Sequence, residues 1–155
     1  MNKWLRLFGF ILLCQFAGII GSVFTMPKIA SWYSTLQMPW FTPPNWIFGP
    51  VWTTLFALMG ISLYLLWEKK SDKRFKLAMV IFGVQFALNI LWNFMFFGLE
   101  SPFLGLVEIA FLWASIAMTI ATFYMISKKA GTVLIPYILW VSIATALNYY
   151  VLILN

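Results

Sequence analysis

Five long apolar stretches constrain the fold of this sequence more than any other feature. A helix that crosses the hydrocarbon core of a bilayer needs about 20 mostly apolar residues. Stretches of that kind predict membrane-spanning helices over residues 4–24, 46–67, 77–97, 104–126 and 132–154. They use about 100 of the 155 residues at that length each, which leaves room for connections only. The sequence therefore predicts an all-α integral membrane protein, a single five-transmembrane-helix bundle over residues 1–155.

The composition excludes several classes of protein and site. Hydrophobic residues make up 63% of the chain and charged residues only 9%, far from the balance that covers a soluble domain. One Cys rules out a disulfide within the chain, and the lack of His rules out a His-ligated metal site or a Ser-His-Asp arrangement. We therefore predict no metal site, no required cofactor and no acid–base catalytic residues.

The Lys and Arg residues predict the orientation of the bundle. Positive residues favour the cytoplasmic side of a membrane protein. With five spans, nine Lys and Arg residues fall on the side of the N-terminus and only Lys28 falls on the other side. We predict a cytoplasmic N-terminus and an external C-terminus. This asymmetry explains the net charge of +6 without a nucleic-acid partner, and the basic side can also contact anionic lipid.

The only long connection, residues 25–45, combines four prolines with aromatic residues. Proline restricts the backbone, so the loop is expected to be stiff. One interpretation is an interfacial aromatic belt. The other is an outer lid over a cavity between the helices, which the length of the loop favours.

Polar residues within the predicted spans mark faces that point into the bundle. Gln85, Asn89 and Asn93 recur every four residues on one face of the third span, and Trp92 lies beside them. Interhelical hydrogen bonding explains such a stripe, and so does a polar handle in an apolar ligand site. We favour the first explanation for Gln85 and the second for Asn89.

Two other spans carry aromatic faces. Trp52 and Phe56 are one turn apart in the second span and can stack on a flat ligand, although core packing also explains them. Trp140 and Ala144 in the fifth span can form a recess or a close helix contact. Glu108 is the one carboxylate within a predicted span, and its role is left open.

Several motifs resemble the TspO/MBR family of tryptophan-rich sensory proteins and translocator proteins. They are W-Y-S-T-L-Q-M-P-W-F-T-P-P-N-W at 32–46, G-P-V-W at 49–52, A-L-N-I-L-W-N-F-M-F-F-G at 87–98 and P-Y-I-L-W-V-S-I-A-T-A-L-N-Y-Y at 136–150. The resemblance covers nearly the whole chain.

The resemblance implies a five-helix bundle, commonly a homodimer, with a ligand pocket closed by the first loop. It implies binding of porphyrins such as protoporphyrin IX and heme-related tetrapyrroles, and of synthetic isoquinoline carboxamides. Carried over by position, the ligand-binding residues are Tyr33, Pro43, Trp52, Phe56, Asn89, Trp92, Trp140 and Ala144.

Three functions are expected from this resemblance. The first is a membrane receptor or sensor for porphyrins. The second is light- and oxygen-dependent porphyrin degradation, with Trp52 and Trp140 as electron donors, and the third is transport of tetrapyrroles or other hydrophobic small molecules. Sterol binding is disfavoured because no basic residue follows Tyr149 and Tyr150. We expect the protein in a bacterial cell membrane.

Overall fold

The computed structural model describes residues 2–155, and this part of the chain is helical without strands. The elements are α1 (Lys3–Ile29), the short turn η1 (Tyr33–Thr35), α2 (Asn45–Trp67), α3 (Phe75–Asn93), the π-helical turn η2 (Phe94–Gly98), α4 (Pro102–Ile126), α5 (Lys128–Thr132) and α6 (Ile135–Leu154). Five helical units within residues 2–155 are long and apolar enough to cross a membrane. The predicted all-α membrane bundle is thereby confirmed.

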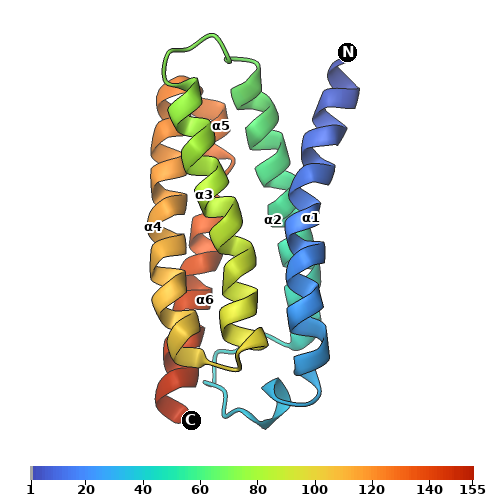
Figure 1. Cartoon of the computed structure of the whole chain (residues 1–155), viewed down its shortest axis with the longest axis vertical. Helices are drawn as coiled ribbons and strands as arrows, with labels where there is room; N and C mark the ends of the chain where they lie inside the picture. The colour runs from blue at the N-terminus through green and yellow to red at the C-terminus, as the bar shows by residue number, and fades with distance from the viewer. Residues whose placement is uncertain (1) are drawn as a thin grey trace.

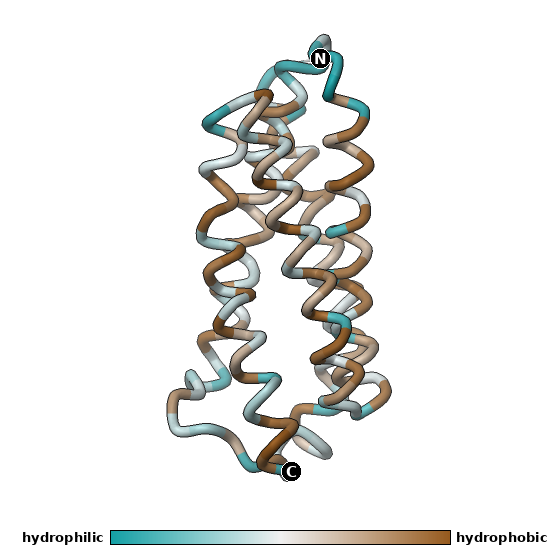
Figure 2. The backbone as a smooth tube through the Cα atoms, turned by 90° about the vertical axis from the view of Figure 1, so that its left-hand side faces the viewer, coloured by the Kyte–Doolittle hydropathy of each residue, from teal (hydrophilic) through white to brown (hydrophobic). Residues whose placement is uncertain are grey.

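The helices form an elongated bundle (Figure 1). α1 packs against α2 and α3, α4 packs against α3 and α6, and the short α5 packs against α2 and α4. The N-terminus and the α2–α3 connection lie at one end, whereas the first long loop, the α3–α4 connection and the C-terminus lie at the other. Apolar residues follow the length of the helices (Figure 2).

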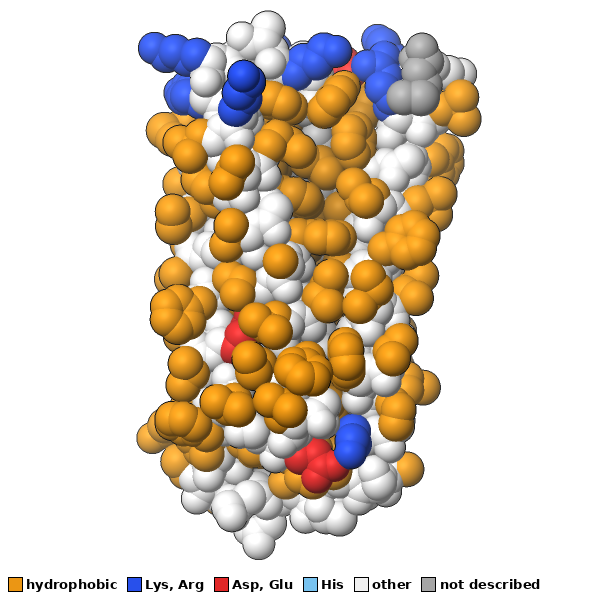
Figure 3. All heavy atoms as spheres, in the orientation of Figure 1, with side chains coloured by type: hydrophobic (Ala, Val, Ile, Leu, Met, Phe, Trp, Pro, Cys, Tyr) orange, Lys and Arg blue, Asp and Glu red, His pale blue; other side chains and the backbone are white. Residues whose placement is uncertain are grey.

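The two ends of the bundle differ in charge. Lys and Arg side chains gather at the end that carries the N-terminus (Figure 3). Nine of the ten belong to the start of α1, the α2–α3 connection with the start of α3, and the start of α5: Lys3, Arg6, Lys69, Lys70, Lys73, Arg74, Lys76, Lys128 and Lys129. Lys28 lies at the opposite end. We call these the basic half and the lid half. The side of the membrane that each half faces stays a prediction.

α1 is longer than the sequence pattern indicates. It continues through Pro27 to Ile29, so the connection spans residues 30–44 and not 25–45. The fixed φ of Pro27 is close to the helical value, although proline gives up one backbone hydrogen bond of the helix. Ser31 Oγ donates to the Pro27 carbonyl at 3.0 Å and the Trp32 amide donates to the Lys28 carbonyl at 3.0 Å, which completes the helix end. We refer to residues 30–44 as the lid; it contains a helical turn, η1.

The last span, predicted as one helix over 132–154, is one helix from Ile135 to Leu154, α6. The short α5 precedes it and is separated from it by a two-residue turn. Pro136 occupies the first turn of α6, where its missing N–H costs nothing. The third span, predicted over 77–97, runs from Phe75 to Gly98 and ends in η2 instead of an α-helical turn.

Packing in the basic half includes a close approach of two helix backbones. A Cβ atom on Gly60 of α2 would lie 2.5 Å from Ile11 Cα of α1. The absence of a side chain therefore lets α1 and α2 touch. Nearby, Ser62 Oγ donates to the buried Ala130 carbonyl of α5 at 2.7 Å, which joins α2 to the last span.

Candidate functional site

Two adjoining cavities occupy the lid half. One has a volume of about 150 Å³ and reaches the lid, and the other has a volume of about 520 Å³ and is bordered by residues of α1, α2, α3, α4 and α6. The residues that line both are Thr25, Ile29, Asn45, Phe48, Trp52, Trp92, Asn93 and Ala144. Because the cavities share these walls, we treat them as one site with two compartments.

Aromatic rings form the wall of α2 and its contact with α6. Trp52 and Phe56 stack with ring centroids 5.6 Å apart and planes at 28°. Phe48 meets Trp140 edge to face at 5.7 Å, and Trp52 meets Tyr137 edge to face at 6.4 Å. Such rings offer flat apolar surface, which suits a planar hydrophobic ligand.

A chain of buried polar groups reaches the larger compartment at Asn89. Asn89 Nδ2 donates to Tyr137 Oη at 2.7 Å, and that hydroxyl donates to Gln85 Oε1 at 3.0 Å. Gln85 Nε2 lies 3.5 Å from Met59 Sδ. Gln85 therefore has the interhelical role that the sequence favoured. Asn89 has such a role as well, but its side chain also lines the larger compartment.

A second polar group joins three helices beside the smaller compartment. Trp92 Nε1 donates to Asn148 Oδ1 at 3.1 Å, and Asn148 Nδ2 donates to the Pro102 carbonyl at 2.7 Å. These bonds connect α3, α6 and the start of α4. The orientation of the Trp92 ring is thus fixed by a bond and by its stacking on Phe96 at 4.9 Å.

Asn93 points toward α1 instead of α6. Its Oδ1 accepts from Thr25 Oγ1 at 2.9 Å, and its Nδ2 donates to the Asn89 carbonyl at 3.1 Å. A Cβ on Gly21 would lie 2.7 Å from Asn93 Nδ2, so a glycine is needed for this approach. The predicted stripe of the third span is therefore shared between two neighbouring helices.

The lid divides into a half-buried and an exposed part. Tyr33 lines the smaller compartment and packs on Phe97 at 5.5 Å, and burial raises the pKa of its hydroxyl. Trp32 packs edge to face on Phe96 at 5.4 Å. Trp40, in contrast, is 95% exposed. The start of the lid thus covers the cavity, while Trp40 has the exposure expected of an interfacial belt residue.

Most of the predicted ligand-binding residues border the cavities. Those that line the smaller compartment are Tyr33, Trp52, Trp92, Trp140 and Ala144. Phe56 and Asn89 line the larger one. Pro43 lines neither compartment. It lies just before the start of α2, and its neighbours Thr42 and Asn45 contribute to the lining in its place.

Several wall residues were missed as site residues. Thr25 was assigned to the loop, but the longer α1 brings it into the wall. Phe48 precedes Trp52 by one turn, and this spacing was a signal that could have identified it. Phe96 and Phe97 both face the smaller compartment because of the π-helical turn, which no sequence pattern indicated.

The chemistry of the lining is apolar with amides and hydroxyls. No charged side chain among the described residues lines either compartment. Glu108 of α4 is 6% exposed, and neither of its carboxylate oxygens has a hydrogen-bond partner within residues 2–155. It lies outside both linings, although Ile109 beside it borders the larger compartment. The lining therefore offers apolar surface, amides and hydroxyls, with no charged group among the described residues.

Comparison with known proteins agrees with this architecture. The sequence model of the TspO/MBR family matches residues 10–154. A tryptophan-rich protein TspO of Archaeoglobus fulgidus is 43% identical, over 97% of each chain, and one of Chlorobaculum tepidum is also 43% identical, over 100% of this chain and 99% of the relative. The human translocator protein is 36% identical over 96% of this chain and 89% of its own. The chain therefore belongs to the TspO/MBR family, as an integral membrane protein with the fold that its apolar helices predicted.

Proposed function

We propose that the protein is a membrane receptor that binds a porphyrin, such as protoporphyrin IX or a heme-related tetrapyrrole, in the two joined compartments under the lid. The observation that carries the proposal is the shared wall of Trp52, Trp92 and Phe48, with rings on α2 and α3 around a cavity whose lining has no charge. A flat macrocycle offers both faces to such rings. The same chemistry suits isoquinoline carboxamides, whose carbonyl group can accept from an amide.

Binding is tested by quenching of Trp fluorescence when protoporphyrin IX is added to the purified protein in detergent. We expect Trp52→Ala to weaken binding about tenfold or more, because the variant loses ring stacking and apolar contact with the ligand. A tenfold change in affinity corresponds to about 1.4 kcal/mol. Trp140→Phe should weaken it less. Trp4→Phe is the control, because Trp4 is 66% exposed in the basic half. Unchanged affinity in both site variants would sink this placement of the pocket.

A second candidate, light-dependent degradation of the bound porphyrin, rests on a separate observation. Trp52 and Trp140 both line the smaller compartment, so two oxidisable rings border the same space. In this proposal the excited porphyrin and oxygen supply the chemistry, and the indoles donate electrons. The test is product formation in light, which should be lost in Trp140→Phe. Bleaching at the rate of free porphyrin would refute this activity.

The orientation and the assembly are part of the proposal. Nine basic residues at one end favour a cytoplasmic N-terminus in a bacterial cell membrane. Single cysteines at position 28 or 128, in a Cys14→Ala background, should be labelled by an impermeant maleimide from outside the cell only at position 28. We also propose a homodimer, to be checked by the mass of the protein–detergent complex in light scattering.

A further inference from the structure

An amide side chain at the end of α6 pairs with the backbone of the lid. The Gln37 N–H donates to Asn155 Oδ1 at 2.9 Å, and Asn155 Nδ2 donates to the Gln37 carbonyl at 3.0 Å. The same Nδ2 donates to the Val151 carbonyl of α6 at 2.9 Å. Both main-chain groups of one lid residue are thus satisfied by a single side chain, which is itself anchored to its helix.

Asn155 continues the face of α6 that borders the smaller compartment. Trp140, Ala144, Asn148 and Val151 line that compartment at intervals of three or four residues, and Asn155 follows Val151 by four. These intervals place all five on one side of a helix. The residue that holds the lid therefore extends the same wall that encloses the cavity.

Gln37 lies at the corresponding place on the lid. Met38, the next residue, lines the smaller compartment, as do Tyr33 before it and Thr42 after it. Met38 also packs with Tyr33 against Phe96, Phe97 and Val151. The pair of hydrogen bonds consequently joins the lid to the end of α6, two segments that both contribute walls to the smaller compartment.

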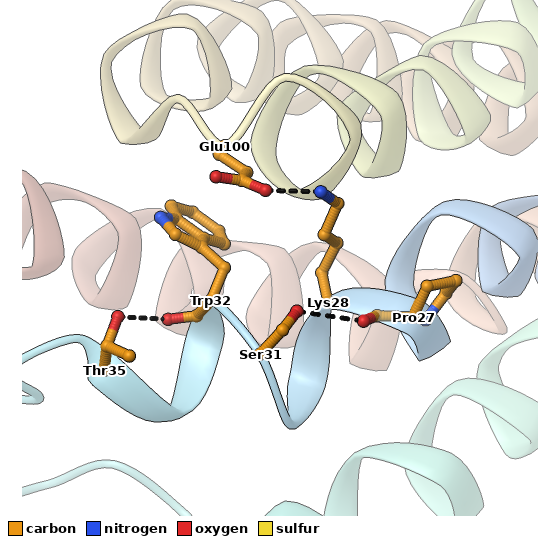
Figure 4. A network of polar contacts seen from close by, with 6 residues as sticks. All are labelled: Pro27, Lys28, Ser31, Trp32, Thr35 and Glu100. Atoms are coloured by element: carbon orange, nitrogen blue, oxygen red, sulfur yellow. Dashed lines mark hydrogen bonds and ion pairs between the residues drawn. The ribbon is translucent and has the colours of Figure 1, made fainter.

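The other polar attachment near the lid differs in kind. Lys28, at the end of α1, pairs with Glu100 on the α3–α4 connection, beside the ring of Trp32 (Figure 4). The two side chains are 32% and 40% exposed. Salt weakens an exposed ion pair of this kind. The pairing of Asn155 with Gln37 involves neutral groups and should be insensitive to salt.

We propose that Asn155 is a positioning residue of the ligand site: its amide holds the lid closed, and opening of the Asn155–Gln37 pair precedes exchange of the ligand. The proposal rests on the proposed function for the identity of the ligand. It assigns to Asn155 an effect on the rate of exchange without contact with the ligand itself.

The first test measures dissociation of protoporphyrin IX by stopped-flow fluorescence. Asn155→Ala should raise the dissociation rate about fivefold or more, because two hydrogen bonds that restrain the closed lid are lost. The increase should be similar in about 0.1 M and about 1 M salt, whereas any effect of Lys28→Ala should shrink in the higher salt. Leu154→Ala, a neighbouring change in a side chain that is 40% exposed, is the matched control and should leave the rate unchanged.

The second test needs no ligand. The amide of Gln37 has Asn155 Oδ1 as its hydrogen-bond acceptor, so hydrogen exchange at this amide should accelerate in Asn155→Ala, while amides within α6 keep their protection. Unchanged exchange at Gln37, or a dissociation rate within about twofold of the wild type, would overturn the role of Asn155. If porphyrin fails to bind the wild type, the proposed function fails. Faster hydrogen exchange at Gln37 in Asn155→Ala still supports the restraint of the lid by Asn155.

Discussion

The two halves of the bundle differ in how their helices contact one another. In the basic half, Gly60 lets α2 touch the backbone of α1 at Ile11, and Ser62 bonds directly to the backbone at Ala130. In the lid half, large rings such as Trp52 and Trp92 stand between the helices and enclose two cavities. In the basic half two helices touch through their backbones, and in the lid half large side chains stand between the helices around cavities.

The difference shows how a membrane protein can hold a cavity open. Lipid tails are as apolar as the core, so helix association depends on close packing and hydrogen bonds. The basic half supplies the packing. In the lid half, bonds such as Trp92 to Asn148 and Asn89 to Tyr137 fix the walls without filling the space. The cavity thus depends on a tight half to hold the helices in register.

The largest effect is expected for Gly60→Ala. The added Cβ would clash with backbone atoms of Ile11, and a backbone cannot move aside as a side chain can. We expect a loss of about 3 kcal/mol or more in the free energy of unfolding. The measurement is thermal or SDS-induced unfolding followed by circular dichroism. Gly83→Ala, where an added Cβ meets nothing within 4 Å, should be at least as stable as the wild type, because Ala favours a helix over Gly by up to about 1 kcal/mol. Equal stability of the two variants would show that the backbone contact at Gly60 does not hold the basic half together.

The next effect is expected for Tyr137→Phe. Loss of the hydroxyl leaves the Asn89 donor and the Gln85 acceptor without their shared partner in a buried place. A loss of about 2 kcal/mol in the same unfolding assay is expected from two unpaired groups. Tyr149→Phe is the control, since Tyr149 is 49% exposed. A change below about 0.5 kcal/mol would show that water or relaxed geometry satisfies both amides.

A smaller effect is expected for Trp92→Phe, which sharpens the role of the hydrogen bond in the lid half. The ring stack with Phe96 can persist, but Asn148 Oδ1 loses its donor. We expect about 1 kcal/mol less stability. Porphyrin affinity should fall as well, because the wall is no longer fixed. Melting of the variant at the wild-type temperature would argue that stacking alone orients the ring.

The smallest effect concerns the basic end. Asp72 accepts hydrogen bonds from the Arg74 side chain and amide, which lower the pKa of its carboxyl to about 2 from an ordinary 3.8. A lowered pKa adds stability that is complete above 3.8 and is lost as the pH falls toward 2. The difference in melting temperature between wild type and Asp72→Asn should therefore be small and constant above about pH 5. It should shrink as the pH falls from 3.8 toward 2. A difference in melting temperature that grows as the pH is lowered would contradict this expectation.

The sequence predicted the spans and the aromatic walls because both depend on simple periodicity. Apolar length located five helices, and the four-residue spacing of Trp52 with Phe56 and of Trp140 with Ala144 identified faces that do line the cavities. Asn93 shares the spacing of Asn89, yet it bonds to α1. Spacing gives the direction of a side chain on its own helix but not which neighbouring helix lies there.

The features that the sequence could not predict depend on local backbone conformation and on hydrogen bonds between residues far apart in the chain. Pro27 suggested a loop, but its φ is also close to the helical value. α1 continues to Ile29, and hydrogen bonds such as that from Ser31 Oγ to the Pro27 carbonyl complete its end. The contact of Asn155 with Gln37 joins residues 118 positions apart, and no local pattern indicates it. The position of Pro43 outside the cavity likewise depends on where α2 begins.

The π-helical turn at the end of α3 has a consequence for chain length. The Leu99 amide donates to the Phe94 carbonyl and the Ser101 amide to the Phe96 carbonyl, each five residues back. Such a turn holds one residue more than an α-helix would use over the same rise. Deleting a single residue within 94–98 would remove that surplus and convert the turn to regular helix, with the chain beyond it left close to its present place. Glu100, with its φ of 50°, could then still face Lys28. The end of α3 thus carries one residue more than its helical rise requires.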